Sequence, residues 1–276
     1  MQLTRPIMSA AIALAFTAAA VSAQTQAPRR YTTVSYLKVA PGKAGALREY
    51  YATGDGGKLI RAQMKANPKM QSWSLRQQLF AGNPAPEANY FILIGWEGAP
   101  TLMEPAKRDE LYKAATGMTY AQQQEKLAGM REVVGSRISH LHDTVGQMEQ
   151  GDIVVAQRYK IAPGHTTELS ALMHDFRLPM MTESIKGDGA LKFWAFSHLA
   201  LAGGSSEAWD GTITRGYKTL DAALGATGNQ GNPNGPAMRF AKLFPTKSYT
   251  DYQNEFREFA TLVHTETHSI AVMIRP

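Results

Sequence analysis

The sequence contains no cysteine among its 276 residues. Disulfide bonds and catalysis through a thiolate are therefore both excluded, and the stability of the fold must come from its hydrophobic core. The 29 lysines and arginines and the 23 acidic residues are spread along the chain rather than gathered into blocks. The sequence therefore lacks the basic patch that typically binds nucleic acid, and we expect no nucleic-acid partner.

Several common catalytic and binding motifs are also missing. The chain has no Gly-rich phosphate loop, no EF-hand loop, no H-E-x-x-H zinc motif and no G-x-S-x-G nucleophile elbow. His174 and Asp175 are adjacent on an expected helix, and Asp143 follows His142, but no nucleophile accompanies either pair. A hydrolase triad is therefore not predicted, and histidine is the most informative residue type in the chain.

Residues 1–23 have the pattern of a cleaved secretory signal. One arginine precedes an apolar stretch from Ile7 to Val21, and the small residues of Val21-Ser22-Ala23 form a cleavage site. The stretch is short for a membrane anchor, and no later stretch approaches 18 uninterrupted apolar residues. We expect a periplasmic or secreted mature chain that starts near Gln24 and does not insert stably into a membrane; an uncleaved anchor is the alternative.

The rest of the chain repeats itself. The tract Ala40-Pro41-Gly42 returns about 122 residues later as Ala162-Pro163-Gly164. Each tract follows a run rich in β-forming residues, Tyr31 to Val39 in one copy and Ile153 to Ile161 in the other, and precedes an amphipathic pattern. The pattern predicts a strand, a Pro-Gly turn and a helix in each of two fused copies.

Each copy continues with two strands and a second helix. A strand that begins near a tryptophan, Trp73 or Trp194, ends at a glycine turn, and the next strand completes a hairpin. Thr119 and Ser248 are expected to cap the second helix of their copies. Behind them the apolar positions of the two helices match at a constant offset of 129 residues, and a final strand closes each copy. These positions are Leu127, Met130 and Val134 in the first copy and Phe256, Phe259 and Val263 in the second.

Domain boundaries follow from this repeat. We divide the chain into a signal peptide at residues 1–23, a tail at 24–30, a first repeat at 31–147 and a second repeat at 148–276. The final strands of the copies are predicted at residues 137–146 and 267–275. A Gly/Asn/Pro-rich insertion at residues 225–236 is expected to form a loop, with a lid over a pocket as the alternative.

The order strand, helix, strand, strand, helix, strand in each copy is the split βαβ pattern of a ferredoxin-like unit. One face of such a sheet is covered by its own helices, and the other face needs a partner, which the second copy supplies. We therefore predict an α+β fold of two fused ferredoxin-like βαββαβ repeats. In this arrangement the chain resembles the dimeric α+β-barrel superfamily, as a single-chain form with tandem repeats.

That superfamily includes cofactor-free monooxygenases acting on aromatic substrates, haem-degrading enzymes, chlorite dismutases, dye-decolourising peroxidases, muconolactone isomerases and the NIPSNAP group. The G-x-x-D-G run of the peroxidase group is missing here. The resemblance implies the barrel fold and does not by itself choose among these functions.

Four histidines are the first candidates for chemistry. His140 and His142 lie in the predicted final strand of the first copy, where alternation places both on one face. We expect His268 to occupy the position of His140 in the second copy, with His264 four residues before it. These imidazoles are suited to acid/base catalysis or metal binding, and structural histidines bonded to the backbone are the alternative.

A second group of candidates lies on the tryptophan strands. His198 shares a strand face with Trp194 and Phe196, and the matching face of the first copy carries Trp73. Such an aromatic face would suit a pocket for a planar apolar molecule, and a plain core with polar residues near its edge is the alternative.

Arg158 replaces Tyr36 at the same position of the first strand of each copy. Its guanidinium would bind a carboxylate, a phenolate or a haem propionate, or pair with Asp210 on a neighbouring strand. Because Arg158, His198 and Asp210 have no like residue in the first copy, we expect the pocket in the second copy.

The sequence thus predicts an exported protein that binds a small apolar or aromatic molecule. The catalytic hypothesis is a cofactor-free oxygenase, isomerase or lyase whose general base is one of His140, His142, His198 and His268. A non-catalytic periplasmic ligand-binding or stress-related protein is one alternative, and a haem-binding protein with an axial imidazole is another. The sequence leaves the cofactor unknown and assigns no metal; we expect a monomer or a homodimer.

Overall fold

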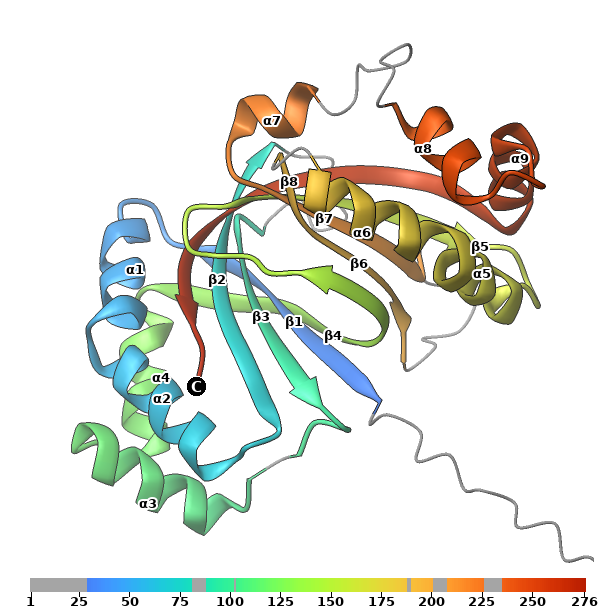
Figure 1. The fold of residues 1–276 in the computed structure, drawn as a ribbon. Coiled ribbons are helices and arrows are strands. Elements are labelled where there is room, and N and C mark those ends of the chain that lie inside the picture. The colour runs from blue at the N-terminus through green and yellow to red at the C-terminus, as the bar shows by residue number, and fades with distance from the viewer. Residues whose placement is uncertain (1–28, 81–87, 102, 188–189, 201–207, 226–234) are drawn as a thin grey trace, which may run out of the picture.

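The computed structural model describes residues 29–80, 88–101, 103–187, 190–200, 208–225 and 235–276 (Figure 1). Two halves of the chain follow each other, and each builds a strand-rich unit with its helices on the outside. Among the described residues no helix is both long and apolar enough to cross a membrane.

The first half contributes β1 (Arg30–Val39), α1 (Ala44–Ala52), α2 (Asp55–Ala66), β2 (Met70–Phe80), β3 (Tyr90–Glu97), α3 (Pro105–Thr116), α4 (Tyr120–Ala128) and β4 (Arg131–Gly146). The second half contributes β5 (Ile153–Ile161), α5 (Thr166–Leu172), the π-helix η1 (Met173–Arg177), α6 (Leu178–Gly187), β6 (Leu191–Leu199), β7 (Gly211–Tyr217), α7 (Leu220–Gly225), α8 (Pro236–Leu243), α9 (Tyr249–Phe259) and β8 (Ala260–Ile274).

The strands of the described chain form one closed barrel in the order β1-β3-β2-β8-β5-β7-β6-β4. Each half supplies a run of four antiparallel strands, β4-β1-β3-β2 and β8-β5-β7-β6, which is the ferredoxin-like order. The two runs join where β2 pairs with β8 and where β4 pairs with β6. We call these junctions the β2/β8 seam and the β4/β6 seam. The α+β fold of two ferredoxin-like repeats is thereby confirmed.

Both long final strands contain a β-bulge at equivalent positions. In β4 the bulge falls at His142, between the paired residues Leu141 and Asp143, and in β8 it falls at Ala271. A bulge inserts one extra residue, so the alternation of inward and outward side chains changes phase there. The bulges therefore decide which face of each seam receives a given side chain.

The final strands are longer than predicted. β4 begins at Arg131 and β8 at Ala260, where helical spacing suggested that the preceding helices continue. Val134 and Val263, expected on those helices, lie in the strands. Each of these valines is the extra residue of a β-bulge, and the residues on either side of it pair with β1 or β5, which outweighs the local helical pattern.

The predicted helix starts are confirmed. Thr119 forms a capping box with Gln122, and the Ser248 side chain accepts hydrogen bonds from the backbone at the start of α9. Of the predicted loop at residues 225–236, positions 226–234 lie outside the described residues; α7 ends at Gly225 and α8 begins at Pro236. Neither of these short helices was predicted.

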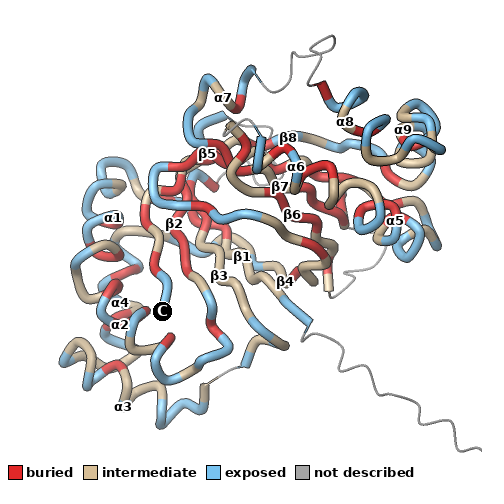
Figure 2. Tube along the Cα trace, viewed as in Figure 1, coloured by how far each residue is buried: buried red, intermediate tan, exposed pale blue. Residues whose placement is uncertain are grey.

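Two apolar cores lie between the barrel and its helices, one in each repeat. Trp73 belongs to the first core, and Trp194 and Phe196 belong to the second. Figure 2 shows the buried residues concentrated along the strands, with the outer sides of the helices exposed. The strands therefore have a helix-covered outer face and an inner face that lines the barrel.

Candidate functional site

The barrel encloses a cavity of about 360 Å³, which we call the lumen. One end carries the exposed side chains of Gln71 and Arg275, and the other carries Arg76, Arg158 and His268, which are 4%, 7% and 3% exposed. The wall between them combines apolar side chains, among them Val34, Phe91, Leu93, Leu141, Phe193 and Met273, with hydroxyl side chains such as those of Thr32, Ser139 and Ser197. An apolar pocket with a few convergent polar groups is typical of small-molecule sites.

The deep end of the lumen holds a charged cluster around Glu266, which is fully buried. Arg158 Nη2 donates to Glu266 Oε2 at 2.9 Å, and Arg158 Nη1 donates to Thr212 Oγ1 at 2.9 Å. His264 Nε2 lies 2.9 Å from Glu266 Oε1. Burial acts to raise the pKa of Glu266, but Arg158 and His268 outweigh it, so this pKa lies well below its usual range. The carboxylate is therefore ionised at neutral pH.

Arg76 is the unbalanced charge of this cluster. Its Nε donates to Ser74 Oγ at 3.2 Å, and within the described residues no carboxylate pairs with it. Burial and the nearby charge of Arg158 lower the pKa of Arg76 to about 10, so the guanidinium is still protonated at neutral pH. A buried cation without a counterion is costly, and an anionic ligand would remove that cost.

Two guanidinium groups stack on Trp209, which is 2% exposed. Arg158 Cζ lies 4.4 Å and Arg137 Cζ 4.8 Å from the centroid of the indole. Such contacts, together with the ion pair to Glu266, hold Arg158 in one orientation. Arg158 is thus a fixed part of the wall with its charge paired, whereas the charge of Arg76 has no carboxylate partner in the described chain.

His268 is the imidazole of the lumen. Its Nε2 lies 3.2 Å from Glu266 Oε2, in poor alignment for a hydrogen bond, and its Nδ1 has no hydrogen-bond partner among the described residues. Burial lowers the pKa of His268 more than Glu266 raises it, and Arg76 and Arg158 lower it further. The imidazole is therefore neutral at pH 7, with a ring nitrogen able to accept a proton.

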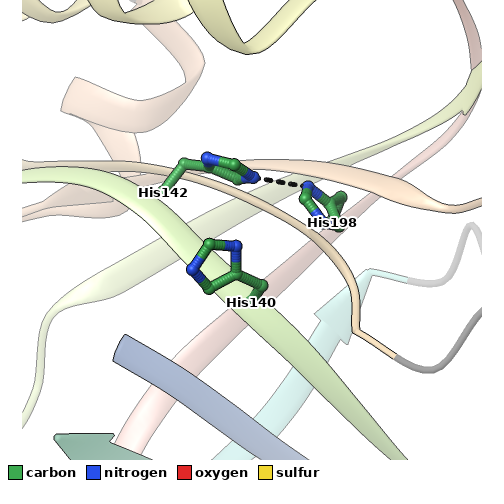
Figure 3. Close-up of side chains that lie close together, drawn as sticks. All are labelled: His140, His142 and His198. Carbon is green, nitrogen blue, oxygen red and sulfur yellow. Dashed lines mark hydrogen bonds between the residues drawn. The ribbon is translucent and has the colours of Figure 1, made fainter. Parts of the chain in front are cut away.

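A second histidine group lies on the outer face of the β4/β6 seam, and we call it the three-histidine cluster (Figure 3). It consists of His140 and His142 from β4 and His198 from β6, all half-buried. His142 Nε2 and His198 Nδ1 form a 2.6 Å hydrogen bond, and one ring nitrogen from each residue lies within 4.8 Å of the others. Burial lowers the pKa of all three imidazoles, that of His142 to about 4 with the help of His198 and His140.

The structure therefore brings together three of the four histidines predicted as catalytic and separates His268 from them. The pairing also shows that His268 and His140 are not equivalent. Val154 pairs with His268, and the equivalent Thr32 pairs with Ser139. The expected equivalence is wrong by one residue, and one residue moves a side chain to the other face of a strand. His268 accordingly faces the lumen and His140 the outside.

The aromatic candidates occupy the cores rather than a pocket. Trp73, Trp194 and Phe196 are 3%, 0% and 1% exposed and pack beneath the helices of their repeats. None of them lines the lumen or the second cavity described below. This placement fits the plain core that the sequence left as the alternative.

Asp210 does not pair with Arg158. Its Oδ2 lies 3.1 Å from Lys160 Nζ, and its Oδ1 accepts a 2.6 Å hydrogen bond from the backbone N–H of Ile161. Arg158 lies opposite Thr212 in the strand pairing, two residues beyond Asp210. The alternative of an Arg158–Asp210 ion pair is therefore wrong, and Glu266 is the partner.

Sequence reasoning missed Arg76, Glu266 and Thr212. Each is a polar residue within a strand, and its side chain is buried. A charged residue at such a position is a signal in principle. It can be recognised only once the barrel shows that the inner face is also enclosed.

A second cavity of about 320 Å³ lies outside the barrel, between the sheet of the second repeat and its helices. Tyr159, Arg177, Arg215, Tyr252 and Phe256 are among its lining residues. No histidine lines it among the described residues. It can hold a small molecule, but it lacks the imidazole base that the lumen offers.

No protein-family model and no curated protein matches the sequence. Solved structures do match its fold. A candidate monooxygenase from Lactobacillus acidophilus superposes with a TM-score of 0.54 at 9% identity, over 90% of this chain and 96% of that one. A candidate monooxygenase from Fusobacterium nucleatum gives a TM-score of 0.53 at 8% identity, over 91% and 95%.

An anthrone oxidase-like protein gives a TM-score of 0.50 at 9% identity, over 91% of this chain and 94% of that one. Identities this low show the fold and leave the chemistry to be argued from this chain's own residues. Together with the barrel order and its two four-stranded runs, they establish that the chain has the fold of the dimeric α+β-barrel superfamily, in a tandem-repeat, single-chain form.

Proposed function

We propose that the protein is an enzyme that binds a small molecule with an apolar body and an anionic group in the lumen and removes a proton from it. The observation that carries this proposal is Arg76, a buried guanidinium with no carboxylate partner in the described chain, at the deep end of a cavity whose wall also has apolar side chains such as Phe91 and Leu141. A carboxylate or phenolate placed there would supply the missing counterion.

Different residues of the lumen would bind different parts of the ligand. Arg76 and Ser74 would hold the anionic group, while the apolar wall that includes Phe91 and Leu141 takes the body of the ligand. Arg158 is fixed by Glu266 and Trp209 and adds positive potential at the same end. The chemistry of this wall suits a small aromatic or branched apolar compound.

His268 would act as the general base. A neutral imidazole can take the proton of an acidic C–H or O–H bond, and the electron pair left on the substrate is then stabilised by Arg76 and Arg158. The imidazolium that forms lies beside the Glu266 carboxylate, which stabilises its charge. This Glu266–His268 arrangement resembles the base-and-orienter pairs of other acid/base sites.

The deprotonated substrate has two outcomes. It can take the proton back from His268 at another carbon, which is an isomerisation, or it can react with dioxygen, which is the cofactor-free oxygenase route. The candidate monooxygenases of like fold make the oxygenase route the first to test.

We propose also that residues 1–23 direct export and are removed. These residues lie outside the described part of the chain, so the support is the signal pattern of the sequence. The mass of the protein recovered from a periplasmic fraction should correspond to a chain that begins near Gln24. Recovery of the full chain from a membrane fraction would contradict cleavage.

The enzyme test uses residues 24–276 and a panel of aromatic carboxylic acids and phenols. Binding is followed by the rise in melting temperature, oxygen consumption by an electrode, and proton removal by exchange of substrate hydrogen for deuterium. Arg76→Met should abolish binding, whereas His268→Gln should retain binding and lose exchange and oxygen uptake. Binding without exchange in the unaltered protein would instead indicate a ligand-binding protein, and a Soret band would indicate haem.

The second cavity provides the matched control. Arg215→Met removes a half-buried arginine there, as Arg76→Met removes a buried one in the lumen. If the lumen is the site, the Arg215 variant should bind the panel as the unaltered protein does. The opposite pattern, with binding lost only in Arg215→Met, would assign the ligand to the outer cavity and refute the proposal.

A further inference from the structure

The three-histidine cluster has a donor set of the kind that metal ions require. One ring nitrogen from each of His140, His142 and His198 lies within 4.8 Å of the other two. Three imidazoles around one zinc ion at about 2.0–2.1 Å place their nitrogens roughly 3.3 Å apart. Small rotations of the side chains therefore suffice to bring all three nitrogens to one ion.

The backbone and neighbouring rings set these side chains in place before any ion binds. His140 lies directly opposite His198 in the strand pairing, and the bulge at His142 turns that residue to the same outer face. The His140 ring lies 5.3 Å from that of Tyr31, and the His142 ring stacks on Phe196 with centroids 5.7 Å apart. Ligands held in this way lose little side-chain entropy on binding.

We propose that His140, His142 and His198 bind one divalent transition-metal ion of the zinc class at the β4/β6 seam. Imidazole suits zinc, copper, nickel and iron, whereas magnesium and calcium prefer oxygen ligands. Three protein ligands leave a fourth position for water or another small ligand. In the metal-free protein a proton lies between His142 and His198; on binding it moves to the other nitrogen of its ring, so no net proton need be lost.

Several charges around the cluster act on a bound cation. Asp210 acts favourably on a positive charge at His198, and Arg29 acts unfavourably at His140 and His142. Asp143, next to His142, forms a 3.0 Å contact with His174 Nδ1. Arg29 is exposed, so solvent screens its repulsion. Asp210 and solvent screening therefore both oppose the repulsion from Arg29.

The three histidines come from both repeats, so a bound ion would connect the two repeats. Two lie on the last strand of the first repeat and one on a strand of the second. A bound ion would therefore cross-link the two repeats at this seam and raise the stability of the barrel. At the equivalent place on the β2/β8 seam the residues are Gln77, Ser269 and Ala271, which offer no imidazole.

The first test is metal binding to the mature protein, prepared without a histidine tag and stripped with a chelator. Calorimetric titration with zinc chloride should give one equivalent, and cobalt(II) should give the visible absorption of a four-coordinate site. At zinc 100-fold above Kd the melting temperature should rise by about 5 to 10 °C. Magnesium chloride should leave it unchanged. Absence of saturable zinc binding would overturn the proposal.

Variants locate the site. His142→Gln and His198→Gln should each weaken zinc binding at least about 100-fold, while His165→Gln, in the turn before α5, should bind as the unaltered protein does. Melting temperatures measured without zinc show whether each variant folds. If the His142 or the His198 variant does not fold, His140→Gln is used in its place. Zinc binding that survives in the His142/His198 double variant would refute the assignment. Arg76→Met should bind zinc normally, so this test is independent of the lumen proposal.

Discussion

The two seams of the barrel join equivalent strands, but they carry their imidazoles on opposite faces. Each joins the second strand of one repeat to the final strand of the other, and each final strand has its bulge at the equivalent position. The β2/β8 seam places Arg76 and His268 on its inner face, close to Arg158 and Glu266. The β4/β6 seam places its three histidines on the outer face.

The equivalent positions show how far the copies have diverged. On the inner face Arg76, Glu266 and His268 match Ser197, Arg137 and Ser139, while on the outer face His140, His142 and His198 match Ser269, Ala271 and Gln77. At these matched positions each seam therefore has imidazoles on one face only, the inner face at β2/β8 and the outer face at β4/β6. Each group also draws on both repeats, so the expectation of one pocket belonging to the second copy is not met.

The largest effect should come from the buried ion pair of the β2/β8 seam. Glu266→Gln leaves the Arg158 guanidinium without its counterion and should lower the free energy of unfolding by about 3 to 5 kcal/mol. Urea denaturation measures this change. Replacing Arg158 by methionine in the same protein should recover most of it. A loss below about 1 kcal/mol in the single variant would mean that the cluster is solvated.

Arg76 should behave in the opposite way in the ligand-free protein. Arg76→Met removes a buried cation that has no carboxylate partner in the described chain, and should raise the free energy of unfolding by about 1 kcal/mol. The same variant should lose ligand binding, so stability and function would separate. A destabilised variant would show that Arg76 has a counterion in the resting protein.

The lowered pKa of His268 should be detectable in the pH dependence of the free energy of unfolding. Its pKa is lowered in the fold, so the unfolded chain takes up a proton near pH 6.5 that the folded chain does not. The contribution of His268 to the free energy of unfolding is therefore fully present above pH 6.5. As the pH drops to 5, the free energy of unfolding falls by an amount on the order of 1 kcal/mol. His268→Gln should show a shallower fall in urea titrations at pH 7, 6 and 5.

The depressed pKa of Glu266 acts in the same direction but at lower pH. Its contribution is lost only as the pH falls below about 4.3, the ordinary range of a glutamate. The three-histidine cluster also lowers the free energy of unfolding on acidification. Because the unaltered protein and the His268→Gln variant both contain this cluster, its effect cancels when the two are compared. Equal pH slopes for the two proteins would contradict the assignment to His268.

The smallest effect should be at the β4/β6 seam without metal. His198→Gln keeps a polar side chain of similar length at a half-buried position, and should change the free energy of unfolding by less than about 0.5 kcal/mol in the presence of a chelator. Urea denaturation with excess chelator tests this. A loss comparable with that of Glu266→Gln would make the cluster structural and remove the contrast between the seams.

Local sequence signals predicted much of the fold. The β-branched runs, the Pro-Gly turns and the capping residues Thr119 and Ser248 act between near neighbours, so strand positions and helix starts could be predicted. The lengths of β4 and β8 could not, because their first residues extend the strands by pairing with β1 and β5, which are distant in sequence. The helices α2, α3, α7 and α8 were missed for a related reason: they depend on packing against neighbouring helices and the sheet.

The candidate sites were predicted less completely. His140 and His142 were correctly placed on one face, but their approach to His198 depends on a seam between the repeats that no local pattern specifies. His268 was assigned to the wrong equivalent residue because a single-residue error in register exchanges the faces of a strand. Arg76 and Glu266 were missed because a lumen exists only after the barrel closes.

Closure of the barrel also orders events during folding. The β2/β8 seam joins Leu75 to Val272, so the ring cannot be completed until the last strand of the chain is available. Pairings so distant in sequence are slow to form because the chain must first lose much of its freedom. Until then β2 is an unpaired edge strand of the first repeat, and such an edge is open to aggregation.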